Sequence, residues 1–386
     1  MKSKLLLCIL SLAFFACQES PKTTNHKNCI TLDVNIDAAT SKEQLSHLAT
    51  NTLIVLPTSD SLLLSAINRI NSTEKYIYIA DPTALYRFSW DGVYKGGIKR
   101  QGSGPEEYPN IGDFQIDNTG NAWISNRGNQ SITQYSWDNQ FKERLKIELW
   151  MERFFWGGNG FYVYTGNDMG FDNIYQLHYL NPETRQIEHQ FKQVDEHKAK
   201  YLYVHMPNVF QKTKNGEILL TQLFNDTVYS LTPTSYIPKY VINLEGKNIP
   251  ESFYERDYQN IMEFFTELHK QDRYAYGIDV FLETEKAYWI GYFYQRQYHL
   301  SILPKNDSER QLNFNTLYVD KLFGYPINLS EATLFVQNDG RIIIPLQPDE
   351  IMEYAQAHLS EEQQKQIKDY IYIADQNPIL LVINPL

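Results

Sequence analysis

Leu85-Tyr-Arg-Phe-Ser-Trp-Asp-Gly-Val-Tyr94 and Ile132-Thr-Gln-Tyr-Ser-Trp-Asp-Asn-Gln-Phe141 are two versions of one unit. Phe88-Ser-Trp-Asp91 recurs as Tyr135-Ser-Trp-Asp138, and in both copies the Asp is followed by Gly or Asn, where a tight hairpin turn requires a positive φ. Self-similarity of this kind is typical of repeat architectures.

Each copy follows an alternating aromatic or β-branched strand, Tyr76–Asp81 before the first and Ala122–Asn126 before the second. Four weaker copies follow, at 161–180, 216–231, 287–302 and 340–344. A unit of two strands followed by a chain reversal thus occurs six times. This repetition predicts an all-β fold: a six-bladed β-propeller of four-stranded antiparallel blades. Residues 51–386 give each blade more than the roughly 40–45 residues of a compact repeat, so insertions are expected.

Two helical insertions are predicted. Ser252-Phe-Tyr-Glu255 has the form of a capping box and precedes apolar residues at helical spacing, which predicts a helix over about 251–270. A second stretch, about 349–372, contains another capping box at Ser360-Glu-Glu-Gln363. Both are expected to cover a face or edge of the propeller rather than to bind a cofactor.

Strands near the two termini are expected to complete the ring. The alternating run Ile30–Ile36 predicts an edge strand, and Thr52–Leu56 and Leu62–Ile67 predict the first strands of the propeller. The apolar run Asn377–Ile383 is expected to pair with Leu53–Leu56 in the last blade, because an open ring would expose sheet edges.

The first residues have the pattern of an export signal. Lys2 and Lys4 precede the apolar run Leu5–Phe15, which is too short to span a membrane, and Ala16-Cys17 follows. We interpret residues 1–16 as a lipoprotein signal peptide, Cys17 as the site of lipid attachment, and 17–50 as a tether; an ordinary cleaved signal is the alternative. The expected location is the bacterial envelope, anchored by lipid in the outer membrane on its periplasmic or surface face.

Composition excludes some classes of function. The net charge of −11, without a Lys/Arg block, makes a phosphate-binding surface for nucleic acid improbable. Apart from Cys8 and Cys17 the only cysteine is Cys29, so no disulfide framework is expected. The aromatic fraction of 14% suits half-buried β-strands, although the same side chains could stack on sugars.

With these features the chain resembles the six-bladed β-propeller lipoproteins of Bacteroidetes, which have NHL- and TolB-like relatives. The resemblance rests on Tyr76–Asp81, Gly102-Ser-Gly-Pro-Glu-Glu-Tyr-Pro109, Ile111–Asp117 and Asp375-Gln-Asn-Pro-Ile-Leu380. Glu106 stands where the family pattern has Gly, so the turn there is expected to differ. The resemblance implies a fold and a periplasmic or surface location, and it implies no catalytic residues.

No local motif predicts catalysis or metal binding. The nine His show no His-x-x-x-His spacing, Gly102-Ser103-Gly104 is neither a nucleophile elbow nor a P-loop, and Asp117–Asn121 is better explained as a hairpin turn than as a calcium loop. No cofactor is therefore predicted, although residues from several blades could still hold an ion in the central channel.

The loop Ile98–Asp117 concentrates glycine, opposite charges and an aromatic residue, and is predicted to join the first blade to the second. Its candidate binding residues are Lys99, Arg100, Glu106, Glu107, Tyr108 and Asp113. In one interpretation they form a polar rim at one mouth of the propeller. In the other, Arg100 pairs with Glu106 or Glu107 inside the loop and holds the connection in place.

Three hypotheses for function follow. The leading one is a non-enzymatic binding module that presents propeller loops to a glycan, a peptide or an envelope protein. The alternative is a hydrolase or lyase acting on carbohydrate or a lactone, with residues converging on the channel from several blades. The third is a structural subunit of an envelope complex.

Overall fold

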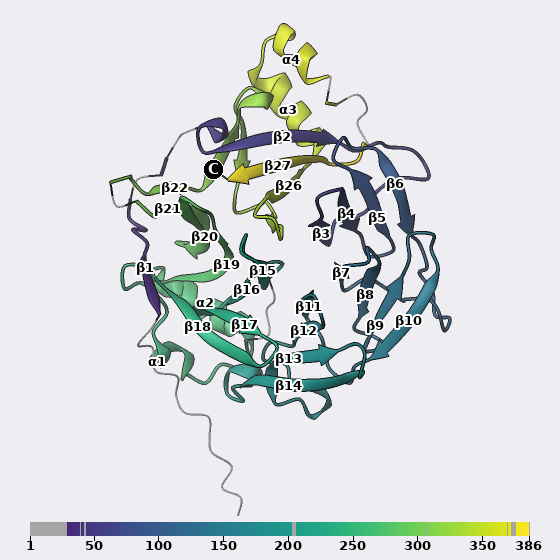
Figure 1. The fold of residues 1–386 in the computed structure, drawn as a ribbon. Coiled ribbons are helices and arrows are strands. Elements are labelled where there is room, and N and C mark those ends of the chain that lie inside the picture. The colour runs from purple at the N-terminus through teal and green to yellow at the C-terminus, as the bar shows by residue number, and fades with distance from the viewer. Residues whose placement is uncertain are drawn as a thin grey trace, which may run out of the picture.

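Six sheets of antiparallel strands surround a common axis in the computed structural model, which describes residues 29–38, 40–41, 44–202, 206–306, 308–368, 370–371 and 376–385. In Figure 1 the inner strands β3, β7, β11, β15 and β19 point toward this axis, and the outer strands form the rim. The predicted six-bladed β-propeller is confirmed. The predicted signal peptide and Cys17, the predicted site of lipid attachment, lie outside the described residues.

The first three blades follow one another along the chain. Blade 1 contains β3 (Arg69–Ser72), β4 (Tyr76–Ala80), β5 (Leu85–Ser89) and β6 (Tyr94–Ile98). Blade 2 contains β7 (Asp113–Ile116), β8 (Ala122–Asn126), β9 (Ser131–Tyr135) and β10 (Phe141–Lys146). Blade 3 contains β11 (Arg153–Trp156), β12 (Phe161–Tyr164), β13 (Tyr175–Asn181) and β14 (Gln186–Gln193).

The other three blades include strands from both ends of the chain. Blade 4 contains β15 (Phe210–Lys212), β16 (Ile218–Gln222), β17 (Asn225–Thr232) and β18 (Ser235–Asn243), and β1 (Ile30–Asp33) joins its edge in parallel. Blade 5 contains β19 (Ala275–Glu283), β20 (Ala287–Tyr294), β21 (Gln297–Pro304) and β22 (Leu312–Phe314). Blade 6 contains β25 (Phe335–Val336), β26 (Ile342–Leu346), β27 (Ile379–Pro385) and β2 (Ala49–Val55).

A separate hydrophobic cluster fills each interface between neighbouring blades. Strand β4 shows how one strand serves two of them: Ile77 and Ile79 face blade 6, whereas Tyr78 and Ala80 face blade 2. Alternation with period two therefore buries both faces of the sheet, which explains why these strands are apolar or aromatic at nearly every position. The predicted packing role of most aromatic residues follows directly from this arrangement.

The ring closes as the sequence predicted. The N-terminal β2 pairs antiparallel with the C-terminal β27, with Ile54 opposite Leu380. Just before β27, the buried amide of Asn377 accepts a hydrogen bond from Leu64 N (2.8 Å) and donates to Pro57 O (2.7 Å) and Leu62 O (2.8 Å). One side chain thus satisfies three backbone groups that lie more than 300 residues away.

The repeated Ser-Trp-Asp turns are equivalent in space. Gly92 and Asn139 have φ of +84° and +64°, as the predicted hairpin turns require. The indole of Trp90 donates to Thr73 O (3.1 Å) and that of Trp137 to Gly120 O (2.6 Å), so each Trp fastens the outer hairpin of its blade to the inner one. The predicted turn at Asp117–Asn121 is also confirmed, because Asp117 Oδ1 accepts from Thr119 N and Asn121 N.

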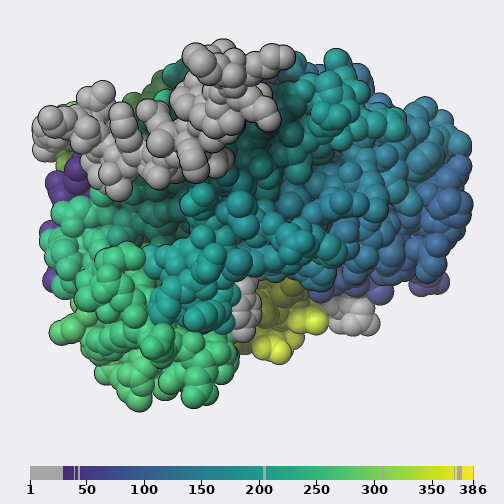
Figure 2. All heavy atoms as spheres, turned by 90° about the horizontal axis from the view of Figure 1, so that it is seen from below, coloured from purple at the N-terminus to yellow at the C-terminus, as the bar shows by residue number. Residues whose placement is uncertain are grey.

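In the described parts of the chain, four α-helices lie between strands: α1 (Glu251–Tyr254), α2 (Ile261–Gln271), α3 (Pro348–His358) and α4 (Glu361–Ile367). The capping box at Ser360 is confirmed, whereas the one predicted at Ser252 is wrong. Ser252 lies inside α1, which begins after Pro250, and a separate helix α2 is capped by Asn260, whose side chain accepts from Met262 N and Glu263 N. In Figure 2 the green segment around residues 250–270 stands out from one face of the disc.

The remaining elements are short. They are β23 (Thr316–Val319), β24 (Tyr325–Asn328) and the 3-10 helices η2 (Leu45–His47), η3 (Gly170–Asp172), η4 (Lys198–Lys200) and η5 (Asp320–Leu322). The strand predicted at Leu62–Ile67 is wrong: Leu62 forms only an isolated bridge with Ser59, and Leu62 and Leu64 are buried because they pack against blades 6 and 1. Within the described ranges, no helix is long and apolar enough to cross a membrane.

Candidate functional site

A cavity of about 400 Å³ lies between blades 3 and 4. Four segments line it: the β12–β13 connection, the chain from the end of β14 to Leu202, the β16–β17 turn, and helix α1 with Ile249. These segments join strand ends on one face of the disc, where the connections between blades also run. We call this cavity the interblade pocket.

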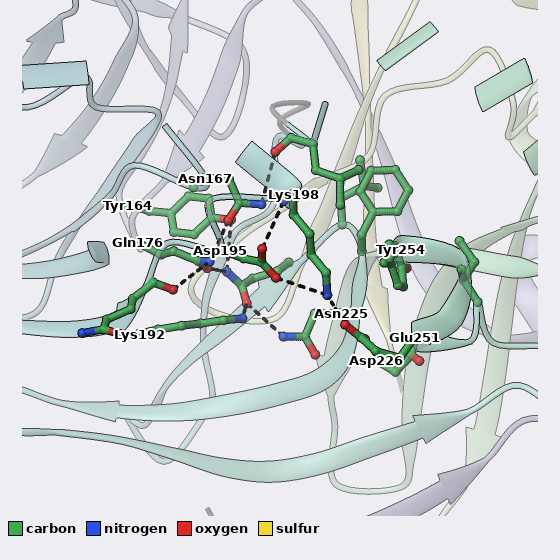
Figure 3. Close-up of a pocket in the computed structure, with 17 residues that line it drawn as sticks. Tyr164, Asn167, Gln176, Lys192, Asp195, Lys198, Asn225, Asp226, Glu251 and Tyr254 are labelled. Atoms are coloured by element: carbon green, nitrogen blue, oxygen red, sulfur yellow. Dashed lines mark hydrogen bonds and ion pairs between the residues drawn. The ribbon is translucent and has the colours of Figure 1, made fainter. Parts of the chain in front are cut away.

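A row of side-chain amides crosses the interblade pocket from one blade to the other (Figure 3). Gln176 donates to Asn167 Oδ1 (2.7 Å) and accepts from Gln222 Nε2 (2.8 Å). The oxygen of Gln222 in turn accepts from Asn225 Nδ2 (3.0 Å) and from the amine of Lys192. Because Gln222 and Asn225 pair across a two-residue turn, the hairpin of blade 4 fixes this end of the row.

The amine of Lys192 occupies one end of the interblade pocket. Lys192 has a φ of +52° at the end of β14, and its side chain extends inward to Gln222 and over the ring of Tyr229 (5.5 Å). Burial lowers the pKa of the Lys192 amine to about 7, since removal from water disfavours the charged form. Among the described residues, no carboxylate forms an ion pair with it.

The other end of the interblade pocket is acidic. Lys198 forms ion pairs with Glu251 (2.6 Å) and Asp195 (3.8 Å) and lies over the ring of Tyr254 (4.7 Å). Burial raises the pKa of the Asp226 carboxyl to about 6. The interblade pocket therefore has a basic and an acidic end, joined by neutral amides.

An exposed apolar ledge adjoins the interblade pocket. It consists of Trp150, Met169, Phe171 and Ile174, each more than a third exposed. Met169, Phe171 and Ile174 lie on the β12–β13 connection, which is held in place by the buried Asn173; its side chain donates to Asp168 O (2.8 Å) and Tyr175 O (2.8 Å). Phe171 has a φ of +59°, which is strained for a residue with a side chain, so a firmly held backbone displays an aromatic ring to solvent.

The predicted loop site is built differently. Ile98–Asp113 joins the outer strand β6 to the inner strand β7, as predicted, on the same face as the interblade pocket, but none of its residues lines that pocket. Arg100 pairs with Glu106 inside the loop (3.0 Å). The internal pair of the second interpretation is therefore present, and a binding role of the loop stays a prediction.

The remaining candidates are also engaged within the fold. Tyr108 is buried, and its hydroxyl lies 2.8 Å from Ile98 O and 3.1 Å from Thr83 O. Glu107 accepts from Gly104 N (2.9 Å), and Lys99 donates to Ser61 O (3.1 Å). These contacts brace the blade 1 to blade 2 connection.

Asp113 lies apart from the loop residues, at the start of the inner strand β7. It pairs with the buried Arg69 of blade 1 (3.5 Å) and accepts from Phe154 N of blade 3 (3.2 Å). Arg69 also donates to Pro207 O, and Asn208 donates to Leu334 O (2.7 Å) in front of blade 6. The chain entering blade 4 is thus bonded across the propeller axis to blades 1 and 6.

Metal ligands do not gather in the parts of the chain that the structure describes: no group of three or more His, Cys, Asp or Glu side chains could hold an ion there. His178, the most deeply buried His, is enclosed within blade 3, where burial lowers the pKa of its imidazole to about 4. Its Nε2 lies 3.1 Å from Tyr175 O and its Nδ1 accepts from Gln190, so both ring nitrogens are engaged within the sheet of blade 3.

A family model described as a domain of unknown function, DUF4934, matches residues 29–384. The chain belongs to the DUF4934 family. No curated protein matches this DUF4934 chain in sequence.

Solved structures resemble the DUF4934 propeller in fold. A protein from Bacteroides fragilis NCTC 9343 that is described as exported has a TM-score of 0.72 at 17% identity, over 93% of this chain and 100% of its own. A DUF4221 family member from Bacteroides vulgatus ATCC 8482 has a TM-score of 0.50 at 8% identity, covering 87% and 96%. A virginiamycin B lyase from Staphylococcus aureus has a TM-score of 0.41 at 10% identity, covering 76% and 81%.

Sequence reasoning missed the interblade pocket of this DUF4934 protein. Its residues come from four separate segments, and each alone is an ordinary polar turn. One signal was present: the connections at 194–209 and 244–274 are much longer than a turn between blades requires, and both contribute to the pocket wall. Long connections that return to one face are where propeller-borne sites are expected.

Proposed function

We propose that this protein is an exported, membrane-anchored binding module that holds a glycan in the interblade pocket. The row of four amides, Asn167, Gln176, Gln222 and Asn225, carries the proposal. A sugar hydroxyl both donates and accepts hydrogen bonds, and a side-chain amide offers both functions in one group. Carboxylates at the acidic end and the rings of Tyr164, Phe224 and Tyr254 complete a lining suited to a polar ligand with apolar C–H faces.

The size and place of the interblade pocket agree with this role. Its volume of about 400 Å³ falls within the roughly 300–1,000 Å³ of small-molecule sites. The adjoining ledge with Trp150 and Phe171 offers a surface over which a longer chain could continue. Export and lipid anchoring rest on the Lys2–Cys17 segment, and the description of the Bacteroides fragilis protein as exported agrees with export.

The test is a glycan array probed with the mature protein, followed by calorimetric titration of the tightest ligand. Asn167→Ala removes the first amide of the row and should weaken binding at least tenfold. Asn159→Ala, an exposed amide in the pocket between blades 2 and 3 on the opposite face, should leave binding unchanged. No glycan binding, or equal losses for both variants, would contradict the proposal.

A second candidate is an enzyme acting on the same glycan. The pKa of about 7 for the Lys192 amine and of about 6 for the Asp226 carboxyl are values that suit general acid–base catalysis near neutral pH. Incubation of the bound glycan with the protein, followed by mass spectrometry of the products, separates the two: an intact glycan supports the binding module, and cleavage that is lost in Asp226→Asn supports the enzyme.

A further inference from the structure

The interblade pocket has ion pairs at one end only. There, Asp195 and Glu251 both form ion pairs with Lys198. Asp226 lies at the same end, where it is hydrogen-bonded by Asn248 and faces Tyr254. The Lys192 amine bonds to Gln222 at the other end, and no carboxylate of the described chain forms an ion pair with it (Figure 3).

The contacts of Lys192 leave hydrogen-bonding capacity directed at the cavity. An ammonium group has three N–H donors, and one of them is accepted by the Gln222 oxygen. The neighbouring groups from the adjacent elements are the Tyr164 hydroxyl, the Tyr229 ring and the Asn225 amide. None of these three groups is anionic near neutral pH, because burial raises the pKa of Tyr164 to about 12. Two charged side chains also act on the amine: Lys198 lowers the pKa of Lys192 and Asp195 raises it, and Asp195 is itself paired with Lys198 (3.8 Å).

A ligand oxygen that carries a negative charge would complete this arrangement. A buried amine is costly as a cation unless an anion accompanies it, and charge-assisted hydrogen bonds are about twice as strong as neutral ones. Hydroxyl groups of the same ligand would meet the amides in the middle and the carboxylates at the far end.

We propose that the glycan held in the interblade pocket contains an acidic sugar, such as a uronic acid, whose carboxylate binds the Lys192 amine. This inference rests on the proposed function and adds the class of sugar and its orientation. The carboxylate lies at the Lys192 end, and the uncharged part of the sugar extends toward Asp226 and Glu251.

Binding of an acidic sugar at Lys192 should be coupled to protonation of the amine. Binding of the carboxylate favours the ammonium form, so at pH 8, where the free amine with its pKa of about 7 is mostly neutral, binding takes up protons. Affinity should fall by up to about tenfold per pH unit above pH 7. Among the other charged groups, Lys198 and Asp195 act on the Lys192 amine with opposite sign. Glu251, paired with Lys198, and Asp226, with its pKa of about 6, lie at the acidic end.

The experiment titrates the protein with acidic oligosaccharides, containing uronic or sialic acid residues, each beside its neutral methyl ester. Wild type should bind the acid at least tenfold more tightly than the ester, and the calorimetric enthalpy at pH 8 should vary with the ionisation enthalpy of the buffer. Lys192→Met should abolish both effects. Lys192→Gln, which keeps a donor to Gln222 without charge, serves if the Met variant does not fold, and Lys200→Met is the matched control on the same connection.

The outcomes distinguish this inference from the proposed function. Equal binding of acid and ester, or a preference that survives in Lys192→Gln, overturns the acidic sugar while glycan binding stands. Absence of binding for every oligosaccharide overturns both. A preference for the acid that is lost in the Lys192 variants and kept in Lys200→Met supports both.

Discussion

Gln222 of blade 4 donates a hydrogen bond of 2.8 Å to the side-chain oxygen of Gln176 of blade 3, and both side chains are buried beneath the interblade pocket. The contact joins the two blades through amides, in addition to the hydrophobic cluster that fills their interface. Gln222→Met and Gln176→Met should each lower the free energy of unfolding by about 1–3 kcal/mol, because each leaves a buried partner unsatisfied. Urea denaturation measures this loss.

The double variant separates a direct contact from two independent ones. If Gln176 and Gln222 act through their shared bond, the double variant should lose less stability than the sum of the single variants, by about 1 kcal/mol or more. Strict additivity would show that the contact does not contribute to stability.

Closure of the ring should depend on Asn377. Asn377→Leu leaves Leu64 N, Pro57 O and Leu62 O without their partner and should cost about 3 kcal/mol or more in unfolding free energy. Asn384→Leu, in the same terminal segment, removes one exposed bond of 3.4 Å and should change stability by less than about 0.5 kcal/mol. Similar effects of the two substitutions in urea denaturation would refute the role of Asn377.

Asp279 should make stability fall as pH rises. Burial raises the pKa of this carboxyl, which is bonded to the Tyr298 hydroxyl, from 3.8 to about 7. Between about pH 4 and 7 the folded state retains a proton that the unfolded state has lost, so rising pH destabilises the fold across this window. Asp279→Asn removes this pH-dependent cost. Its free energy of unfolding should therefore rise by up to about 4 kcal/mol relative to that of wild type as the pH increases from 4 to 8.

Thermal and urea unfolding at several pH values check this difference. The exposed Asp60→Asn should leave the pH dependence of wild type unchanged. A constant difference between Asp279→Asn and wild type at all pH values would mean that folding does not raise the pKa of Asp279.

The loop Ile98–Asp113 should respond to substitution as a brace. Tyr108→Phe removes a buried hydroxyl that donates to Ile98 O, lies 3.1 Å from Thr83 O and accepts from Arg100 N, and should cost about 1–3 kcal/mol. Glu106→Gln weakens an ion pair with Arg100 in which Glu106 is 55% exposed, and should cost less than about 1 kcal/mol. A larger loss for Glu106→Gln than for Tyr108→Phe in urea denaturation would contradict this account.

The sequence predicted the blades well because most blades consist of consecutive strands. The Ser-Trp-Asp turns, the strand β4 with its two buried faces, and the pairing of Leu53–Leu56 with Asn377–Ile383 follow from alternation, turn chemistry and the need to cover edges. The capping box predicted at Ser252 was wrong because such a pattern is short and can occur by chance; the helix begins after Pro250 instead.

The interblade pocket could not be predicted in the same way. Lys192 and Gln222 stand 30 residues apart on different blades, and their contact depends on how blade 3 packs against blade 4. The charged loop drew attention because its residues are contiguous, yet Tyr108 is buried and Arg100 is paired within the loop. Sequence patterns reveal residues that are close along the chain, so they pointed to this connection and not to a site that is assembled from distant segments.

The most direct measurement is a crystal structure of the protein with the glycan that binds most tightly. The account predicts density for the sugar in the interblade pocket, with its carboxylate at the Lys192 amine and its hydroxyls at Gln176, Gln222 and Asn225. Density at the Ile98–Asp113 loop, or in the pocket between blades 2 and 3, with the interblade pocket holding none, would contradict it.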